Sequence, residues 1–388
     1  MRSVKISVVV PTYNAANYLR ECLDSLISQT VMEIEFICVN DGSTDTSLEI
    51  LKEYASKDER FRIIDVPNGG YGKAMNLGLN SAKGKYFAIL EPDDYLPAAD
   101  VYSKMLEQAE KHHLDFVKGS VLKVSKDKSG NIKKELAYKY PEVNKVLCPR
   151  NNTKMFAEML PSTWAALYNL EFLRKFDICY NESPGASFQD MGFYFQTTAL
   201  AEKAMFLTTV TYMYRIDNPN SSSSTRARIR FALRGEYAHI RARLEKYEPI
   251  WNQIKVCFLT RRIVSHYWIY TSLPLSQRLE YLKETRKEFI EMESFSRALL
   301  SPIHKRVMEE TLISAENFMM SEALRVAQRD IIRKNAYLAS LQQNYKKYRW
   351  YTIGAALTFG STSRKLKEKA AIVAKKIQAA EQIIRDFT

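Results

Sequence analysis

Two kinds of hydrophobic pattern alternate along the first hundred residues. Short runs of β-branched and apolar residues, typical of buried parallel strands, occupy residues 5–10, 34–39, 61–66 and 86–90. Between these runs, apolar positions recur every three or four residues, which predicts helices over 17–28, 48–54 and 75–82. Strand and helix patterns that alternate in this way predict an α/β fold, with a mostly parallel, Rossmann-like sheet flanked by helices.

Polar residues follow three of the predicted strands. Residues 11–14 and 40–45 follow the first and second strands, and residues 91–94 place three carboxylates directly after the fourth. Because ligands of open α/β sheets gather at the carboxyl ends of strands, we expect these segments to share one edge. Clustered carboxylates are costly to desolvate without a positive partner, which Mn²⁺ or Mg²⁺ bridging to a diphosphate would supply. The alternative for residues 91–94 is a solvated acidic turn.

Five motifs in this region resemble those of the family 2 glycosyltransferases of GT-A fold. The motifs are VVVPTYN at 8–14, VNDGSTD at 39–45, NGG at 68–70, AKG at 82–84 and EPDD at 91–94. They occur in the family's order and spacing over roughly residues 4–110. The likeness continues more loosely to about Asn220, and then thins to a general likeness to bacterial polysaccharide and lipooligosaccharide glycosyltransferases.

The resemblance implies a nucleotide-sugar site at the first two strand ends. Pro11, Thr12 and Tyr13 match the loop that lines the base, where an aromatic ring can stack on uracil. Asp41 matches the aspartate that accepts a hydrogen bond from the base. The alternative for Asp41 is a turn or a helix cap, a structural role that Asp45 fits better.

The resemblance also assigns residues to the diphosphate and the metal. Lys73, after Gly72, stands where many relatives carry Arg and would meet the diphosphate, although it is alternatively an ordinary surface lysine. Asp93 matches the residue that reaches the metal, and Asp94 would assist the metal or the donor sugar. Glu91 replaces the usual Asp and is one methylene longer, which leaves its contact with the donor ribose open.

The middle of the chain supplies candidates for the base and the acceptor surface. Glycosyl transfer requires a group that takes the proton of the acceptor hydroxyl. Asp190 resembles the second carboxylate of the family's acidic pair, which implies a general base and inversion by direct attack, while Gln189 replaces the first. Asp190 is also expected at a helix N-terminus, where it would equally serve as a cap. Trp164 lies where relatives build the acceptor pocket, or alternatively in the core.

Two neighbouring segments complete this region. Tyr212, Tyr214 and Arg215 indicate a strand beside the site, with Arg215 as a candidate for the diphosphate. Residues 121–145 are rich in lysine, and we expect an irregular, exposed excursion there.

The second half of the chain has a different texture. A length of 388 residues accommodates one large domain with a helical appendage. We expect a GT-A domain over 1–224, a helical region over 225–345 and a basic amphipathic segment over 346–388. The helical region would form a bundle or pair with a second copy in a homodimer.

The C-terminal segment carries much of the charge. Residues 341–388 hold ten basic and three acidic side chains, which is about half of the chain's net charge of +13. Basic clusters around Trp350 and Tyr351 are typical of a segment that binds an anionic membrane surface. A coiled-coil helix is the equally weighted alternative, and the two are compatible.

The predicted function follows from these observations. We expect an inverting, metal-dependent transfer of a hexose or N-acetylhexosamine from a UDP-sugar to a hydroxyl of a cell-surface glycan or lipid-linked oligosaccharide. A short N-terminal lead, five unpaired cysteines and no run of about 18 apolar residues favour a cytoplasmic, peripheral location on the inner face of the membrane. The alternatives are an inactive glycosyltransferase-like scaffold, or a nucleic-acid-binding protein. We expect no nucleic-acid partner, because the charge collects in the tail and not on a binding module.

Overall fold

A computed structural model describes residues 3–127, 129–159, 161–219 and 232–355. The chain divides into two compact units, Met1–Met308 and Glu309–Thr388, which are treated separately. The expected boundary at 224/225 and most of the expected basic segment 346–388 lie outside the described residues.

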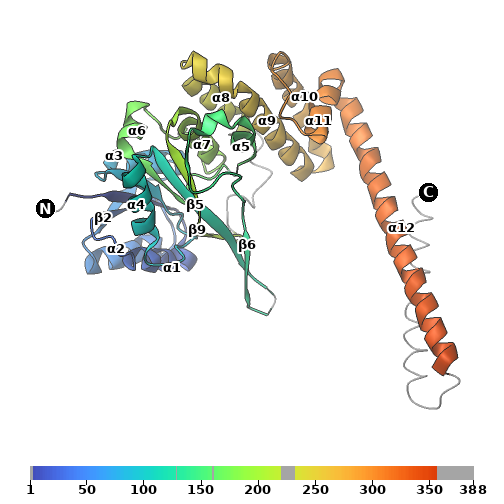
Figure 1. Cartoon of the computed structure of the whole chain (residues 1–388), viewed down its shortest axis with the longest axis horizontal. Coiled ribbons are helices and arrows are strands. Elements are labelled where there is room, and N and C mark those ends of the chain that lie inside the picture. Colours follow the sequence, from blue (N-terminus) through green and yellow to red (C-terminus); the bar gives the residue numbers. More distant parts are fainter. Residues whose placement is uncertain (1–2, 128, 160, 220–231, 356–388) are drawn as a thin grey trace. The chain divides into compact units, whose positions relative to one another are not determined.

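Strands and helices alternate through the first part of the chain, as predicted (Figure 1). Each strand is rich in β-branched or aromatic residues, and each helix buries one apolar stripe. The elements are β1 (Ile6–Thr12), α1 (Ala16–Ile27), β2 (Ile34–Asp41), α2 (Ser47–Lys57), β3 (Phe61–Val66), α3 (Tyr71–Ser81), β4 (Tyr86–Ile89) and α4 (Val101–His112). The predicted α/β fold is therefore confirmed.

The nine described strands form one mixed, mostly parallel sheet in the order β3-β2-β1-β4-β8-β5-β9-β7, with β6 on β5. β1 lies between β2 and β4 and is parallel to both. β8 (Ala166–Asn169) is antiparallel to β4 and β5 (Phe116–Lys126), and β9 (Ala204–Arg215) is parallel to β5. Because β1, β2 and β4 run in the same direction as neighbours, their carboxyl ends share one edge, as predicted.

The first part of the lysine-rich region forms regular strands. β5 continues to Lys126 and pairs with β6 (Ile132–Leu136), so that the two strands form a hairpin that extends beyond the rest of the sheet (Figure 1). All five residues of β6 are exposed, whereas Val121 and Val124 of β5 are buried. The prediction of irregular structure was therefore wrong for the two strands, and it holds for residues 137–145, which form no helix or strand. Lysines are compatible with an edge strand because their ammonium groups reach water on either side of the ribbon.

Short elements connect the later strands. They are β7 (Val146–Leu147), a 3₁₀ turn at Pro149–Asn151, α5 (Thr153–Glu158), α6 (Leu170–Lys175) and α7 (Gln189–Leu200). From Met191 to Leu200 every residue of α7 is buried. This helix therefore lies in the interior, and only its first turn reaches the edge of the sheet.

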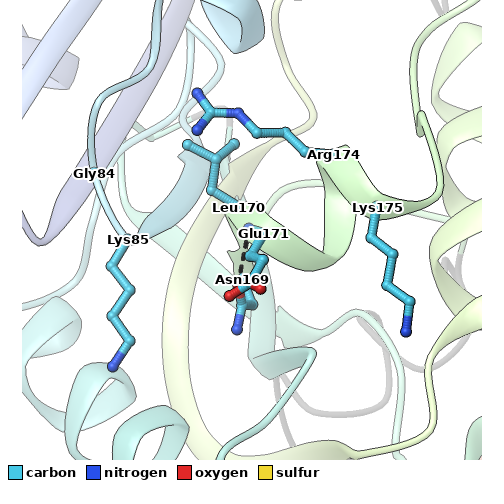
Figure 2. Close-up of a pocket in the computed structure, with 7 residues that line it drawn as sticks. All are labelled: Gly84, Lys85, Asn169, Leu170, Glu171, Arg174 and Lys175. Carbon is cyan, nitrogen blue, oxygen red and sulfur yellow. Dashed lines mark hydrogen bonds between the residues drawn. The ribbon is translucent and has the colours of Figure 1, made fainter.

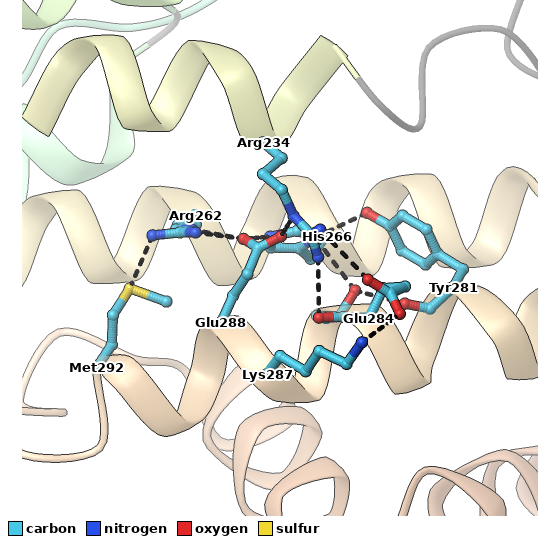
Figure 3. A network of polar contacts seen from close by, with 9 residues as sticks. Arg234, Arg262, His266, Tyr281, Glu284, Lys287, Glu288 and Met292 are labelled. Carbon is cyan, nitrogen blue, oxygen red and sulfur yellow. Dashed lines mark hydrogen bonds and ion pairs between the residues drawn. The ribbon is translucent and has the colours of Figure 1, made fainter.

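The predicted helical region begins with three helices that pack on this domain. α8 (Ala232–Leu244) contacts α7, α9 (Glu248–Ser272) contacts α5, and α10 (Leu275–Glu291) contacts α9. A buried ionic cluster ties the three together, since the Glu288 carboxylate accepts hydrogen bonds from Arg234, Arg262 and His266 (Figure 3). The helices therefore form one bundle that leans on the sheet domain.

Two further helices complete the described chain. α11 spans Pro302–Ile313, and α12 spans Ala315–Ala355, a helix of 41 residues. Among the described residues, no helix has the length and hydropathy that crossing a bilayer requires.

Candidate active site

The nucleotide loop after β1 presents one side chain to solvent. Pro11 and Thr12 are buried, and the Thr12 hydroxyl donates to the Val10 carbonyl at 3.3 Å. Tyr13 is 52% exposed, so its ring is accessible for stacking on a base. Pro11 and Thr12 would therefore act through the backbone they fix.

Asp41 holds a glycine loop in place. Its two carboxylate oxygens accept hydrogen bonds from the backbone N–H groups of Gly69 and Gly70, at 2.7 and 3.0 Å. The predicted structural role of Asp45 is confirmed, since it accepts from the N–H groups of Ala16 and Ser47 at the starts of α1 and α2, each at 3.0 Å. Asp41 is thus not a helix cap, and its contact with a base stays a prediction.

The start of α3 touches the segment that precedes α7. A Cβ added to Gly72 would lie 1.9 Å from the Asn181 carbonyl oxygen, so only glycine allows this approach. The Tyr71 N–H donates to the Gly185 carbonyl at 3.0 Å, which joins the two segments directly. Lys73 is exposed and, within the described residues, makes no ion pair or hydrogen bond, so its ammonium is available to an anionic ligand.

Glu91 lies beneath this junction. Its Oε1 accepts a hydrogen bond from the Tyr71 hydroxyl at 2.7 Å, and its N–H donates to the Tyr212 hydroxyl at 3.0 Å. Burial raises the pKa of the Glu91 carboxyl to about 8, and the nearby charges of Asp93 and Asp190 add to the shift. Four carboxylates, from the end of β4 and the start of α7, therefore face a common region.

Asp93 and Asp94 have different surroundings. The Asp93 carboxylate accepts from the Asn218 side-chain amide at 2.8 Å. Asp94 is 1% exposed, and its Oδ1 accepts from the Arg215 N–H at 2.7 Å. Its Oδ2 is buried and has no hydrogen-bond partner of good geometry in the described part of the chain. Burial followed by repulsion from Asp93 raises the pKa of Asp94 well above its usual range, although the nearby Tyr212 hydroxyl opposes the shift. Such an oxygen lacks a compensating positive group.

Arg215 does not supply that compensation through its side chain. The guanidinium donates to the Glu21 carboxylate at 2.5 Å and to the Asp93 carbonyl at 2.9 Å. It also lies over the Tyr18 ring at 4.9 Å. Arg215 therefore braces the acidic turn from outside, and the contact with the diphosphate considered from sequence is not prepared in this conformation.

The carboxylates of Asp93 and Asp94 fit a divalent cation whose remaining ligands would come from a bound substrate and water. In the described part of the chain, no three His, Cys, Asp or Glu side chains are gathered closely enough to hold an ion alone. Mg²⁺ sites in nucleotide enzymes commonly use one or two carboxylates, with phosphate oxygens and water completing the shell. The unpartnered Oδ2 of Asp94 beside the Asp93 carboxylate suits such an arrangement.

Asp190 occupies the second position of α7, at the helix N-terminus as predicted. Its Oδ1 accepts the Met191 N–H at 2.9 Å. Burial raises the pKa of Asp190 to about 6, although hydrogen bonds from the backbone N–H groups of Met191 and Asp190 and the charge of Lys118 act to lower it. A carboxylate with this pKa is mostly ionised near neutral pH and is still basic enough to accept a proton.

Gln189 is directed into the protein. It is 1% exposed, its Oε1 accepts from the Ser187 N–H at 2.5 Å, and its Nε2 donates to the Ser183 hydroxyl at 2.9 Å. Gln189 therefore shapes the loop before Asp190 from inside, and its predicted contact with an acceptor would be indirect. Trp164 is 9% exposed and stacks on Tyr212 and Tyr214, with ring centroids 4.6 and 5.0 Å apart, which fits the core alternative more closely than an open platform.

A separate hollow lies elsewhere on the domain. A surface depression of about 610 Å³ is lined by Lys85, Arg174 and Lys175, near the amino end of β4 (Figure 2). It is therefore at the opposite end of this strand from Glu91, Asp93 and Asp94. We do not assign it to the candidate active site.

Sequence reasoning missed several residues of the site. Tyr71 and Tyr212 were not predicted as partners of Glu91, and Lys118 and Glu236 were not considered at all. Glu236, in α8, is fully buried, and its Oε2 accepts from the Asn181 amide at 3.0 Å. A lysine within the apolar run of β5 was the one available signal, because buried lysines are rare.

The fold is the GT-A fold, and UDP-bound S. aureus TarS 1-349 is among the similar structures. That likeness has a TM-score of 0.64 and covers 83% of this chain and 91% of the other, at 20% sequence identity, so it shows the fold alone. More specifically, residues 7–174, which make up less than half of the chain, match the model of glycosyl transferase family 2. The matched segment ends before Asp190.

The chain is also similar to curated proteins that are named glycosyltransferases. The chain is 34% identical over 221 residues to the uncharacterized glycosyltransferase EpsJ of Bacillus subtilis, covering 56% of this chain and 62% of the relative. It is 34% identical over 224 residues to glycosyltransferase GlyA of Streptococcus pneumoniae, covering 55% of this chain and 30% of the relative. The chain thus spans less than two thirds of either relative.

Proposed function

We propose that this protein transfers a hexose or N-acetylhexosamine from a UDP-sugar to a hydroxyl of a cell-surface glycan or lipid-linked oligosaccharide, with inversion. The observation that carries the proposal is the convergence of Glu91, Asp93, Asp94 and Asp190 at the carboxyl edge of the sheet. Four carboxylates at one edge of the sheet suit a metal-diphosphate donor on one side and an acceptor hydroxyl on the other.

Similar proteins support the class of donor and acceptor. TarS 1-349 of S. aureus has been crystallised with UDP and with UDP-GlcNAc. A poly(ribitol-phosphate) beta-glucosyltransferase of Bacillus spizizenii is 44% identical over 97 residues, which cover 24% of this chain and 15% of that protein. We infer a UDP-sugar donor and a polymeric or lipid-linked acceptor, and the specific sugar depends on a few contacts in the pocket.

Each residue has a role in the proposed reaction. Tyr13 would stack on the base, Lys73 would meet the diphosphate, and Asp93 and Asp94 would hold a divalent metal. A bound Mn²⁺ or Mg²⁺ supplies positive charge against the leaving diphosphate. The Asp190 carboxylate would accept the proton of the acceptor hydroxyl as its oxygen attacks the anomeric carbon.

Calorimetry of UDP-sugars with and without Mn²⁺ tests the proposal. We expect one UDP-sugar to bind more tightly with Mn²⁺, and Asp93→Asn to remove most of that gain. Asp100→Asn is the matched control, because Asp100 is a half-exposed acid paired with Lys104 on the protein surface. Equal binding by wild type and Asp93→Asn with Mn²⁺ would exclude the metal role, and no binding of any nucleotide sugar would favour the inactive scaffold.

We also propose that the basic segment 346–388 contacts a membrane surface or a second subunit. Only residues 346–355 are described, as the end of α12. Flotation with vesicles of anionic lipid, compared with vesicles of neutral lipid, tests the membrane role. Sedimentation velocity tests the homodimer.

A further inference from the structure

Lys118 is a buried lysine that the proposed reaction does not yet use. It lies in β5 with 3% of its surface exposed. Its ammonium donates to the Ser162 carbonyl and, at 2.8 Å, to the Ser162 hydroxyl. Neither acceptor carries a charge, so the positive charge of Lys118 has no adjacent carboxylate among the described ion pairs.

The packing of α7 on β5 brings Lys118 toward Asp190. Phe116 contacts Tyr168, and Tyr168 contacts Phe193 of α7, with ring centroids 5.8 and 5.2 Å apart. Lys118 is two residues further along the strand and so projects from the same face as Phe116. Asp190 lies one helical turn before Phe193, toward the helix N-terminus at the carboxyl edge of the sheet. Lys118 and Asp190 therefore lie on the same face of the sheet and at the same height along its strands.

The electrostatics agree with this placement. Burial lowers the pKa of Lys118 to about 7, and Asp190 is the one charged group that opposes the shift within the described residues. Reciprocally, the Lys118 charge opposes the rise in the pKa of Asp190. The other ionisable groups around Asp190 are Glu91 after β4, Glu236 in α8, Tyr71 in α3 and Tyr180 before α7.

We propose that Lys118 is a positioning residue for the reaction, which keeps Asp190 in its carboxylate form among acidic neighbours. Burial opposes the ionisation of Asp190, while the Asp190 charge in turn raises the pKa values of the Glu91 and Glu236 carboxyls. Lys118 is the cation that favours the carboxylate in the described part of this site. The role rests on the proposed function of Asp190 as the general base.

The pH dependence of kcat tests the role of Lys118. In Lys118→Met, we expect the acid limb of kcat to move up by about one pH unit, with a loss of about tenfold at pH 5.5 and little loss at pH 8.5. The KM for the donor should not change. Lys126→Met removes a lysine from the exposed end of the same strand and should leave the profile unmoved. An equal loss at every pH would show a merely structural role and overturn the proposal.

A second measurement does not depend on activity. Thermal unfolding of wild type, Lys118→Met, Asp190→Asn and the double variant forms a cycle that isolates the interaction between the two side chains. We expect Lys118→Met to lower the melting temperature in the wild-type background, and to lower it less or raise it beside Asp190→Asn. Equal shifts in both backgrounds would overturn the proposal. If the cycle shows coupling but no sugar is transferred, the proposed function fails and the electrostatic pairing stands.

Discussion

The Tyr71 hydroxyl donates a hydrogen bond of 2.7 Å to Oε1 of Glu91. Tyr71 is the first residue of α3, and Glu91 follows the strand that ends at Ile89, so the bond joins two strand ends of the site. The N–H of Tyr71 also donates to Gly185 in the loop before Asp190. One residue thus connects the nucleotide side of the site with the side that would receive the acceptor.

Tyr71→Phe tests this connection. The change leaves a largely buried carboxyl without its donor, and we expect a loss of about 1–3 kcal/mol in the free energy of unfolding, together with weaker donor binding. Urea unfolding measures the first effect and calorimetry the second. Tyr13→Phe, at an exposed ring, should change stability by less than about 0.5 kcal/mol. Equal stability of the Tyr71→Phe variant and wild type would show that the bond contributes nothing.

Gly72→Ala should disrupt the junction between α3 and the segment before α7. The new methyl group would meet the Asn181 carbonyl, a backbone atom that cannot move alone. We expect a marked fall in melting temperature and loss of transfer. Gly235→Ala in α8 is the matched control, since nothing lies within 4 Å of its added Cβ, and it should stabilise by about 0.5–1 kcal/mol. Tolerance of both changes would contradict the close approach.

The transfer rate should depend on the ionisation of Asp190. Burial raises its pKa to about 6, so the carboxylate form is lost as the pH falls through that value. We expect kcat to decline below about pH 6 and Asp190→Asn to abolish transfer while donor binding is kept. Turnover by Asp190→Asn at the wild-type rate would remove this residue from the mechanism.

Glu288→Gln should destabilise the helical bundle. Glu288 is buried against Arg262, whose side chain is 6% exposed, and loss of the carboxylate would leave that guanidinium without a counter-charge. Breaking one partner of such a pair costs about 3–5 kcal/mol. Glu284→Gln, at a partner that is 41% exposed, should cost less than about 1 kcal/mol. Chemical denaturation of both variants at pH 7 makes the comparison.

The same cluster should make stability depend on pH. Burial lowers the pKa of His266, so as the pH falls through about 6.5 the unfolded chain binds a proton that the folded chain does not. The pKa of Glu288 is also lowered, chiefly by His266 and Arg262 against its burial, and its contribution is lost at still lower pH. We therefore expect stability to fall between pH 7 and pH 5. His266→Gln should flatten this slope, and an unchanged slope would exclude His266 as its cause.

The local pattern of the sequence predicted the sheet up to β4 because each element there carries its own signal. Val8 to Val10 and Phe36 to Val39 are apolar on both faces, as buried parallel strands require. The acidic turn after β4 could be assigned to the site edge for the same reason, since strand direction alone fixes which ends meet. The β5–β6 hairpin could not be predicted in this way. Each strand needs a partner about ten residues away in the sequence, and the lysines obscure the alternation of apolar and polar positions.

Local sequence patterns could not predict which residues contact the side chains of the site. The contact of Tyr71 with Glu91 spans 20 positions, and that of Glu91 with Tyr212 spans 121. Such pairs form only when the sheet has assembled and the loops have taken their folded conformations. Glu236 was missed because a glutamate in an amphipathic helix usually faces water.

Two helices of the bundle touch the loop that leads to Asp190. Glu236 of α8 accepts from Asn181, and the Trp268 ring of α9 meets Phe188 edge to face, with centroids 6.4 Å apart. A truncation that stops soon after β9 would strip away both supports and expose the apolar side of α7. We therefore expect that the smallest stable fragment must extend past α10.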